Sequence, residues 1–236
     1  MLIPSIDLMG GKIVQLVQGE RKALEFADFD EWIERFSSFP MVQLIDLDAA
    51  KGEGSNAGLI SAFTHRLPCQ VGGGIRTLAA AEKMLSFGAR RVIVGSALIR
   101  EGKPNATFAS SAAAALGTRS LVFAIDSKGG QVAIRGWREV VPTTPAEMIA
   151  SLEPHCEAFL YTHIDTEGLM QGIPMQVVSQ LREATTRQLI VAGGIATPEE
   201  IEQLEEMGID AVVGMAIYTG KINLAAMAEN MRSAER

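Results

Sequence analysis

Two aspartates, Asp7 and Asp126, each follow an isoleucine at matching places in the two halves of the chain. Each ends a short apolar run of the kind that forms a buried β-strand. Carboxyl groups on opposite sides of a bound molecule can catalyse an isomerisation, because one removes a proton while the other donates one. A single Asp is more often a helix cap or an acceptor for loop amides. The matched placement favours the catalytic interpretation.

Two glycine-rich turns are also repeated. Residues 71–77 read Val-Gly-Gly-Gly-Ile-Arg-Thr, and residues 191–197 read Val-Ala-Gly-Gly-Ile-Ala-Thr. Each turn precedes a helical pattern and then a strand that ends in glycine. Glycines let backbone amides come close to a phosphate, and a helix N-terminus favours its negative charge. Tight turns without a ligand are the alternative. Two paired copies favour a small substrate with a phosphate at each end.

These glycines and their neighbours define two predicted phosphate cradles. The first cradle comprises Gly72, Gly73, Gly74, Gly95 and Ser96, and the second comprises Gly193, Gly194, Gly214 and Met215. Arg76 follows the first turn, where it either pairs with a phosphate or remains a solvated loop residue. Thr162 ends a later strand, from which its hydroxyl would bond the substrate or Asp126. Trp137 lies in a loop, where an indole either stacks on a flat heteroaromatic group or anchors a lid.

Short β-rich runs alternate with amphipathic helical patterns along the whole chain. The runs are residues 2–6, 42–47, 69–71, 91–94, 121–125, 159–164, 189–191 and 211–213. Helical patterns between them include residues 31–39, 78–87, 145–152, 175–185 and 198–207. Eight units of roughly thirty residues each predict an α/β fold, a single (β/α)8 TIM barrel. An open doubly wound sheet is the alternative, and the paired motifs favour closure.

The repeated motifs keep nearly the same offset along the chain, which predicts an internal duplication. We expect one domain over residues 1–236, built from two similar half-barrels of about 1–119 and 120–236. The first strands of the two halves are diametrically opposite in such a ring. Asp7 and Asp126 would therefore face each other across the catalytic mouth.

Composition excludes several other classes of protein. The 236 residues carry 21 Lys and Arg against 28 Asp and Glu, a net charge of −7, so general affinity for nucleic acid or an anionic membrane is not expected. No apolar stretch reaches the roughly 18 residues of a membrane span. Cys69 and Cys156 are too few for a disulfide framework and lie in no metal-ligand spacing. We expect a cytoplasmic, monomeric protein without a metal site.

Eight segments together carry a resemblance to a known family. They begin at Ile3, Leu44, Val71, Ala124, Arg135, Thr162, Val191 and Val213, and they include Ile-Pro-Ser-Ile-Asp-Leu and Val-Gly-Met-Ala-Ile-Tyr. On these segments the chain resembles the phosphoribosylformimino-AICAR isomerases (ProFAR isomerases) of histidine biosynthesis, over essentially its whole length. The resemblance implies a cofactor-independent Amadori rearrangement of a bisphosphorylated aminoaldose. It further implies Asp7 as general base, Asp126 as general acid, assistance by Thr162, and stacking of Trp137 on the carboxamide imidazole.

The chain departs from the family pattern at three positions in its loops. Gln15 stands where an Arg is common, and His163 and Glu167 stand where members often carry Asp. Three alternatives stay open beside the isomerase. They are a bifunctional isomerase that also accepts phosphoribosylanthranilate, the cyclase subunit of imidazole glycerol phosphate synthase, and a non-catalytic phosphosugar-binding barrel. The Gly-Ile-Arg and Gly-Trp motifs favour the isomerase over the cyclase, and retention of both aspartates disfavours a binding protein.

Overall fold

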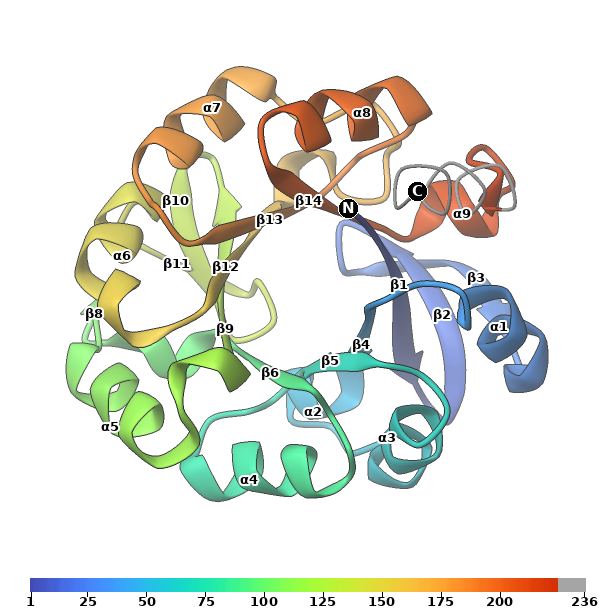
Figure 1. Cartoon of the computed structure of the whole chain (residues 1–236), viewed down its shortest axis with the longest axis horizontal. Helices are drawn as coiled ribbons and strands as arrows, with labels where there is room; N and C mark the ends of the chain where they lie inside the picture. The colour runs from blue at the N-terminus through green and yellow to red at the C-terminus, as the bar shows by residue number, and fades with distance from the viewer. Residues whose placement is uncertain (225–236) are drawn as a thin grey trace, which may run out of the picture.

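A closed ring of parallel strands forms the centre of the computed structural model, which describes residues 1–224. Within these residues the ring contains eight strands in chain order: β1 (Leu2–Met9), β4 (Val42–Asp46), β5 (Cys69–Gly72), β6 (Arg91–Val94), β9 (Leu121–Lys128), β12 (Ala158–His163), β13 (Gln188–Ala192) and β14 (Ile209–Val213). Pairing of β14 with β1, and of β6 with β9, closes the ring (Figure 1). The predicted (β/α)8 barrel is confirmed.

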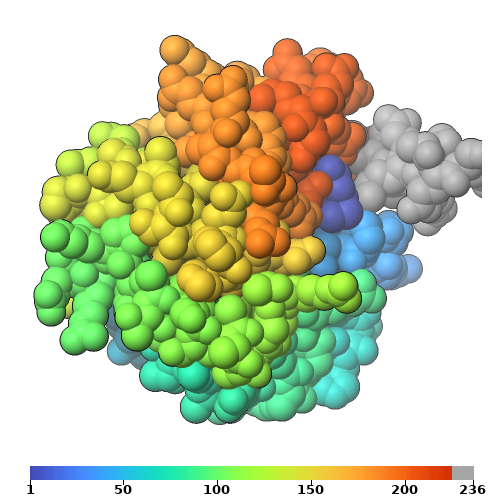
Figure 2. Space-filling view, turned by 60° about the vertical axis from the view of Figure 1, so that its left-hand side comes forward, coloured from blue at the N-terminus to red at the C-terminus, as the bar shows by residue number. Residues whose placement is uncertain are grey.

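Helices surround the ring on its outer side (Figure 1). They are α1 (Phe29–Phe36), α2 (Leu47–Lys51), α3 (Ala57–Thr64), α4 (Leu78–Ser86), α5 (Ala106–Leu116), α6 (Pro145–Leu152), α7 (Met175–Glu183), α8 (Pro198–Glu206) and α9 (Met215–Tyr218). Short 3-10 turns η1 to η4 cover Ser96–Leu98, Thr118–Ser120, Glu153–His155 and Ile164–Thr166. Figure 2 shows α5 to α8 packed side by side in chain order over one flank. No helix within residues 1–224 is long and apolar enough to span a bilayer.

The side chains of each barrel strand point alternately into the barrel and toward the helices, which produces two apolar layers. Ile3 points into the barrel, where it packs with Ile93, Leu160 and Ile190 in one buried cluster. Its neighbour Leu2 belongs to the larger cluster between the strands and the helices. Successive side chains of a strand point to opposite faces, so each strand contributes to both layers. The two layers fix the strands, and therefore fix the side chains at their carboxyl ends.

The ends of α8 illustrate how local sequence sets the elements. Thr197 and Glu200 form a capping box, and Pro198 occupies the first helical position. The predicted helix over residues 198–207 is therefore confirmed to within one residue. The helix predicted over residues 31–39 instead runs from Phe29 to Phe36, because the Asp28 side chain caps its start at the Glu31 amide.

Antiparallel hairpins extend the barrel, and the eight predicted runs do not include them. They are β2 (Lys12–Val17) with β3 (Arg21–Phe26), β10 (Gln131–Ile134) with β11 (Glu139–Val141), and β7 (Ile99–Arg100) with β8 (Lys103–Pro104). β2 pairs with β1, and β10 pairs with β9. The first strands of the two predicted half-barrels, β1 and β9, thus each continue into a hairpin.

Backbone geometry repeats between the halves. Gly95 has φ −120° and ψ −92°, and Gly214 has φ −114° and ψ −94°. Gly73 and Gly193 likewise share positive φ values of 98° and 109°. Such agreement at glycines in unusual conformations supports the proposed duplication.

Candidate active site

A pocket opens at the carboxyl ends of the barrel strands. It is lined by side chains from opposite sides of the ring, among them Asp7 on β1, Asp126 on β9 and Thr162 on β12. This end of a (β/α)8 barrel carries the active site in characterised enzymes of the fold. The pocket therefore brings together the acidic groups expected from the sequence.

Asp7 lies on one side of this pocket, near the end of β1. The Ser5 hydroxyl donates to its carboxylate at 3.4 Å, and the Ser5 carbonyl accepts a bond from the Tyr218 hydroxyl at 3.1 Å. Loss of hydration in the pocket raises the pKa of Asp7 to about 7, against a smaller lowering by Ser5. A carboxyl group with this pKa can exchange a proton near neutral pH.

Asp126 lies on the other side of the pocket. Its carboxylate accepts a bond from the Trp137 indole nitrogen at 2.9 Å and a second bond from the Thr162 hydroxyl. Burial raises the pKa of Asp126, while these two donors lower it. Neither Asp7 nor Asp126 caps a helix in the described residues, whereas Asp46 caps α2 through the Ala49 amide.

Glu167 adds a third carboxyl group to the same pocket. Burial raises its pKa to about 8, and the charges of Asp7 and Asp126 act in the same direction. The sequence alone does not predict a catalytic role for this residue. One feature of the sequence could have identified Glu167 as a candidate: it lies in the loop after the strand of Thr162, and loops at that end of a barrel strand carry functional groups. Burial in the pocket depends on loop packing that the sequence does not show.

The first cradle is built from close backbone approach. A Cβ on Gly73 would lie 2.2 Å from the Asp46 carbonyl oxygen, and one on Gly74 would lie 2.4 Å from the Ala49 carbonyl oxygen. Both glycines line the pocket together with Gly95 and Ser96. Gly72, the last residue of β5, does not line it. A Cβ there would meet side chains of the barrel interior instead of a ligand.

The second cradle has matching geometry. A Cβ on Gly193 would lie 2.4 Å from the His163 carbonyl oxygen, and Gly194 is similarly enclosed by the backbone of Thr166. Gly193, Gly194, Gly214 and Met215 all line the pocket. The two cradles therefore face one cavity, in which the three carboxyl groups also lie. Such a cavity fits an elongated molecule with an anionic group at each end.

Trp137 and the β2–β3 hairpin contribute to the walls. The Trp137 ring packs so closely on Gly19 that a Cβ there would lie 2.6 Å from it. The Gln18 amide donates to the Glu167 carbonyl at 3.1 Å, which joins the hairpin to the loop after β12. Arg76 also lines the pocket, with its guanidinium bonded to the Ala50 carbonyl at 2.6 Å.

His163 is outside the pocket lining, and its ring contacts the Tyr161 hydroxyl at 3.0 Å. Within residues 1–224, no cluster of three or more His, Cys, Asp or Glu side chains has a geometry that could hold a metal ion.

Comparison with known proteins decides the family. A family model described as "Histidine biosynthesis protein" matches residues 1–223. The chain belongs to the histidine biosynthesis protein family. One relative in it, from Methanocaldococcus jannaschii, is 38% identical over 99% of this chain and 100% of its own length. It is named 1-(5-phosphoribosyl)-5-((5-phosphoribosylamino)methylideneamino)imidazole-4-carboxamide isomerase.

Two further members carry the same name. A protein from Thermus thermophilus is 35% identical over 94% of this chain and 96% of its own length. The protein from Methanosarcina acetivorans is 35% identical over 98% of each chain. This member of the histidine biosynthesis protein family is accordingly an isomerase, which confirms the enzyme class expected from the sequence.

Proposed function

We propose that this chain isomerises the substrate named in its relatives, ProFAR, an aminoaldose with two phosphoribosyl groups, to the corresponding aminoketose. The observation that carries the proposal is the single pocket with three carboxyl groups between two glycine cradles. The cradles suit the two phosphates, and the carboxyl groups suit the proton transfers of an aldose–ketose conversion. The acidic net charge is compatible with this substrate, because backbone amides bind phosphate without side-chain charge.

The reaction needs one proton donor and one proton acceptor. In the proposed mechanism the donor protonates the ribose ring oxygen, and the C1–O bond breaks to leave a Schiff base. Asp7 then removes the proton from C2, and the electron pair forms the enolamine that tautomerises to the aminoketose. The raised pKa of Asp7, about 7, supports its role as the base, because its ionised form is then a stronger proton acceptor than an ordinary carboxylate.

Asp126 is the proposed donor, held by Trp137 and Thr162. Glu167 is a second candidate for this step. Its pKa of about 8 keeps it mostly protonated at neutral pH. Burial raises the pKa of Asp126 as well, and the bonds from Trp137 and Thr162 oppose that rise. The variants Asp126→Asn and Glu167→Gln separate the candidates. The donor is the residue whose loss removes the fall in kcat/KM at high pH.

The direct test is an absorbance assay of the purified protein with ProFAR. We expect turnover of ProFAR, and a parallel assay with phosphoribosylanthranilate decides whether the enzyme is bifunctional. Absence of any ProFAR turnover by a folded sample would contradict the proposal, and would leave the cyclase or a non-catalytic phosphosugar-binding barrel. The isomerase names of the relatives disfavour both of these.

A further inference from the structure

The first cradle has cationic side chains beside it. Lys51 and Arg76 both line the pocket there. Their proximity to the cradle follows from α2, since Gly74 packs against the Ala49 carbonyl and Arg76 bonds the Ala50 carbonyl in the same helix. Lys51 is the last residue of this helix. A phosphate on the amides of Gly73 and Gly74 would therefore lie next to positive charge.

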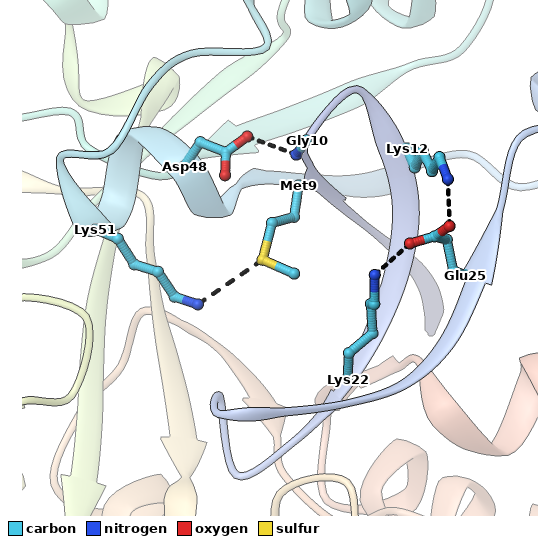
Figure 3. A network of polar contacts seen from close by, with 7 residues as sticks. All are labelled: Met9, Gly10, Lys12, Lys22, Glu25, Asp48 and Lys51. Carbon is cyan, nitrogen blue, oxygen red and sulfur yellow. Dashed lines mark hydrogen bonds and ion pairs between the residues drawn. The ribbon is translucent and has the colours of Figure 1, made fainter.

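Lys51 has no anionic partner among the described residues. Figure 3 shows its ammonium group directed at the Met9 sulfur, 3.8 Å away, and a thioether is only a weak acceptor. In the same view the carboxylate of Asp48 is turned to the Gly10 amide, at 2.7 Å. The lysines of the β2–β3 hairpin are different, because Lys12 and Lys22 are both paired with Glu25. Lys51 thus remains available to an anionic ligand.

Further positive charge adjoins Lys51 outside the pocket. Arg135 and Arg138 share a surface hollow with Lys51 and Arg76. Two acids offset these four cations: Glu139 lies 3.3 Å from Arg135, and Glu53 lies 2.7 Å from Arg138. Net positive charge at this place is notable in a chain whose overall charge is −7.

At the second cradle the described residues that line the pocket include no cation, and Lys221 lies outside this lining with its ammonium on the Met170 carbonyl at 3.4 Å. Lys51 and Arg76 are the cations among the described residues that line the pocket, and both belong to the first end. Gln15, from β2, is the polar side chain placed at the second end. Its Oε1 would lie 2.7 Å from a Cβ on Gly214. Gln15 is 4% exposed, and its amide nitrogen donates to the Val14 carbonyl at 2.9 Å. The second hydrogen of that nitrogen is left for a ligand.

We propose that the two cradles bind phosphate by different chemistry: Lys51 and Arg76 make the first a cationic site, and Gln15 makes the second a neutral, hydrogen-bonding site. This inference rests on the proposed function, in which both cradles hold phosphates of one substrate. Its consequence is that a compound with a single phosphate binds at the first cradle. Attraction between opposite charges is screened by salt, whereas neutral hydrogen bonds are much less affected. Salt dependence of binding should therefore originate at the first cradle alone.

The test uses ribose 5-phosphate as a probe and two matched variants, Lys51→Met and Gln15→Met, which both introduce the same uncharged side chain. Calorimetric titration is performed at about 0.01 M and about 0.15 M salt, between which the screening length falls from about 30 Å to about 8 Å. We expect Lys51→Met to weaken binding about tenfold or more at low salt, the effect of losing one charge-assisted hydrogen bond. It should also reduce the salt dependence. Gln15→Met should leave the affinity for ribose 5-phosphate and its salt dependence unchanged.

Lys51→Arg is the control for folding and for charge, and it should restore tight, salt-dependent binding of ribose 5-phosphate. Equal weakening by Lys51→Met and Gln15→Met would overturn the proposal, as would wild-type salt dependence in Lys51→Met. The titrations measure binding alone, so they remain informative if ProFAR is not turned over. If it is turned over, Gln15→Met should raise the KM for ProFAR several-fold without changing its salt dependence.

Discussion

Asp7, Asp126 and Glu167 share one pocket, and each ionised carboxylate there makes ionisation of the next less favourable. Because the pKa of Glu167 is about 8, this residue mostly holds a proton at neutral pH, whereas Asp7, with a pKa of about 7, is partly ionised. A proton acceptor and a proton donor therefore coexist at the same pH. Side-chain environment, not residue type, sets these proton affinities, and it makes Glu167 the alternative to Asp126 as proton donor.

Glu167→Gln tests this environment through stability. The pKa of Glu167 is raised on folding, so its contribution to stability is complete below its ordinary pKa of 4.5 and is lost as pH rises through about 8. We expect the variant to melt at a higher temperature than wild type at pH 9, and at nearly the same temperature at pH 4. A difference of about 1 kcal/mol corresponds to about 2–4 °C in a domain of this size. Thermal unfolding by circular dichroism measures it, and a constant difference at all pH values would contradict the assignment.

Trp137→Phe tests the hydrogen bond to Asp126. The variant keeps an aromatic ring but removes the indole donor, which lowers the pKa of Asp126. With the donor gone, that pKa should rise. If Asp126 is the acid, the fall of kcat/KM at high pH should then move to higher pH. Trp32→Phe is the matched control, because the indole nitrogen of Trp32 bonds no described group. Identical pH profiles for wild type and Trp137→Phe would show that this bond does not tune the acid.

At the scale of elements, the cradles depend on turns that only glycine fits without strain. Gly193 has φ 109° and no room for a Cβ, whereas Gly58 lies in α3 with nothing within 4 Å of the place where a Cβ would be. Gly193→Ala should therefore lower the free energy of unfolding by about 1–3 kcal/mol. Gly58→Ala should raise it by about 0.5–1 kcal/mol through better helix propensity. Urea denaturation measures both, and a stable Gly193→Ala protein would refute the close approach seen in the second cradle.

The barrel strands could be predicted because apolar runs such as residues 92–94 are buried on both faces, which makes them continuous in sequence. The β2–β3 hairpin could not be predicted in the same way, because β3 is mostly exposed and its polar and apolar residues alternate only weakly. Asp7 and Asp126 could be found from their repeat. The burial of Glu167 could not, since it depends on the contact between Gln18 and the loop after β12.

Across the whole molecule, the two ends of the barrel have different tasks. Toward the amino ends of the barrel strands there is a polar network, in which Arg91 donates to Gln188 at 2.7 Å and to Gln70 at 2.8 Å. Gln70 in turn donates at 2.9 Å to Gln43, which also lines the pocket. Features at this end of a (β/α)8 barrel serve stability, while the other end serves chemistry.

Arg91→Met separates the two tasks. It leaves the side-chain carbonyls of Gln70 and Gln188 without their donor, which should cost about 1–3 kcal/mol of unfolding free energy at the buried Gln70 and less at the half-buried Gln188. The KM for ProFAR should stay at the wild-type value, because neither Arg91 nor its partners Gln70 and Gln188 line the pocket. Denaturation and steady-state kinetics on the same samples test both statements. A changed KM with unchanged stability would contradict this division.

The measurement that bears most directly on the proposed function is ProFAR conversion by wild type, Asp7→Asn and Asp126→Asn, followed by absorbance on samples with matching melting curves. We predict conversion by the wild type and a loss of at least about a hundredfold in kcat for each variant, the range of general acid–base catalysis. Near-wild-type turnover by Asp7→Asn, or no turnover by the wild type, would contradict the proposal that this pocket isomerises ProFAR by acid–base catalysis.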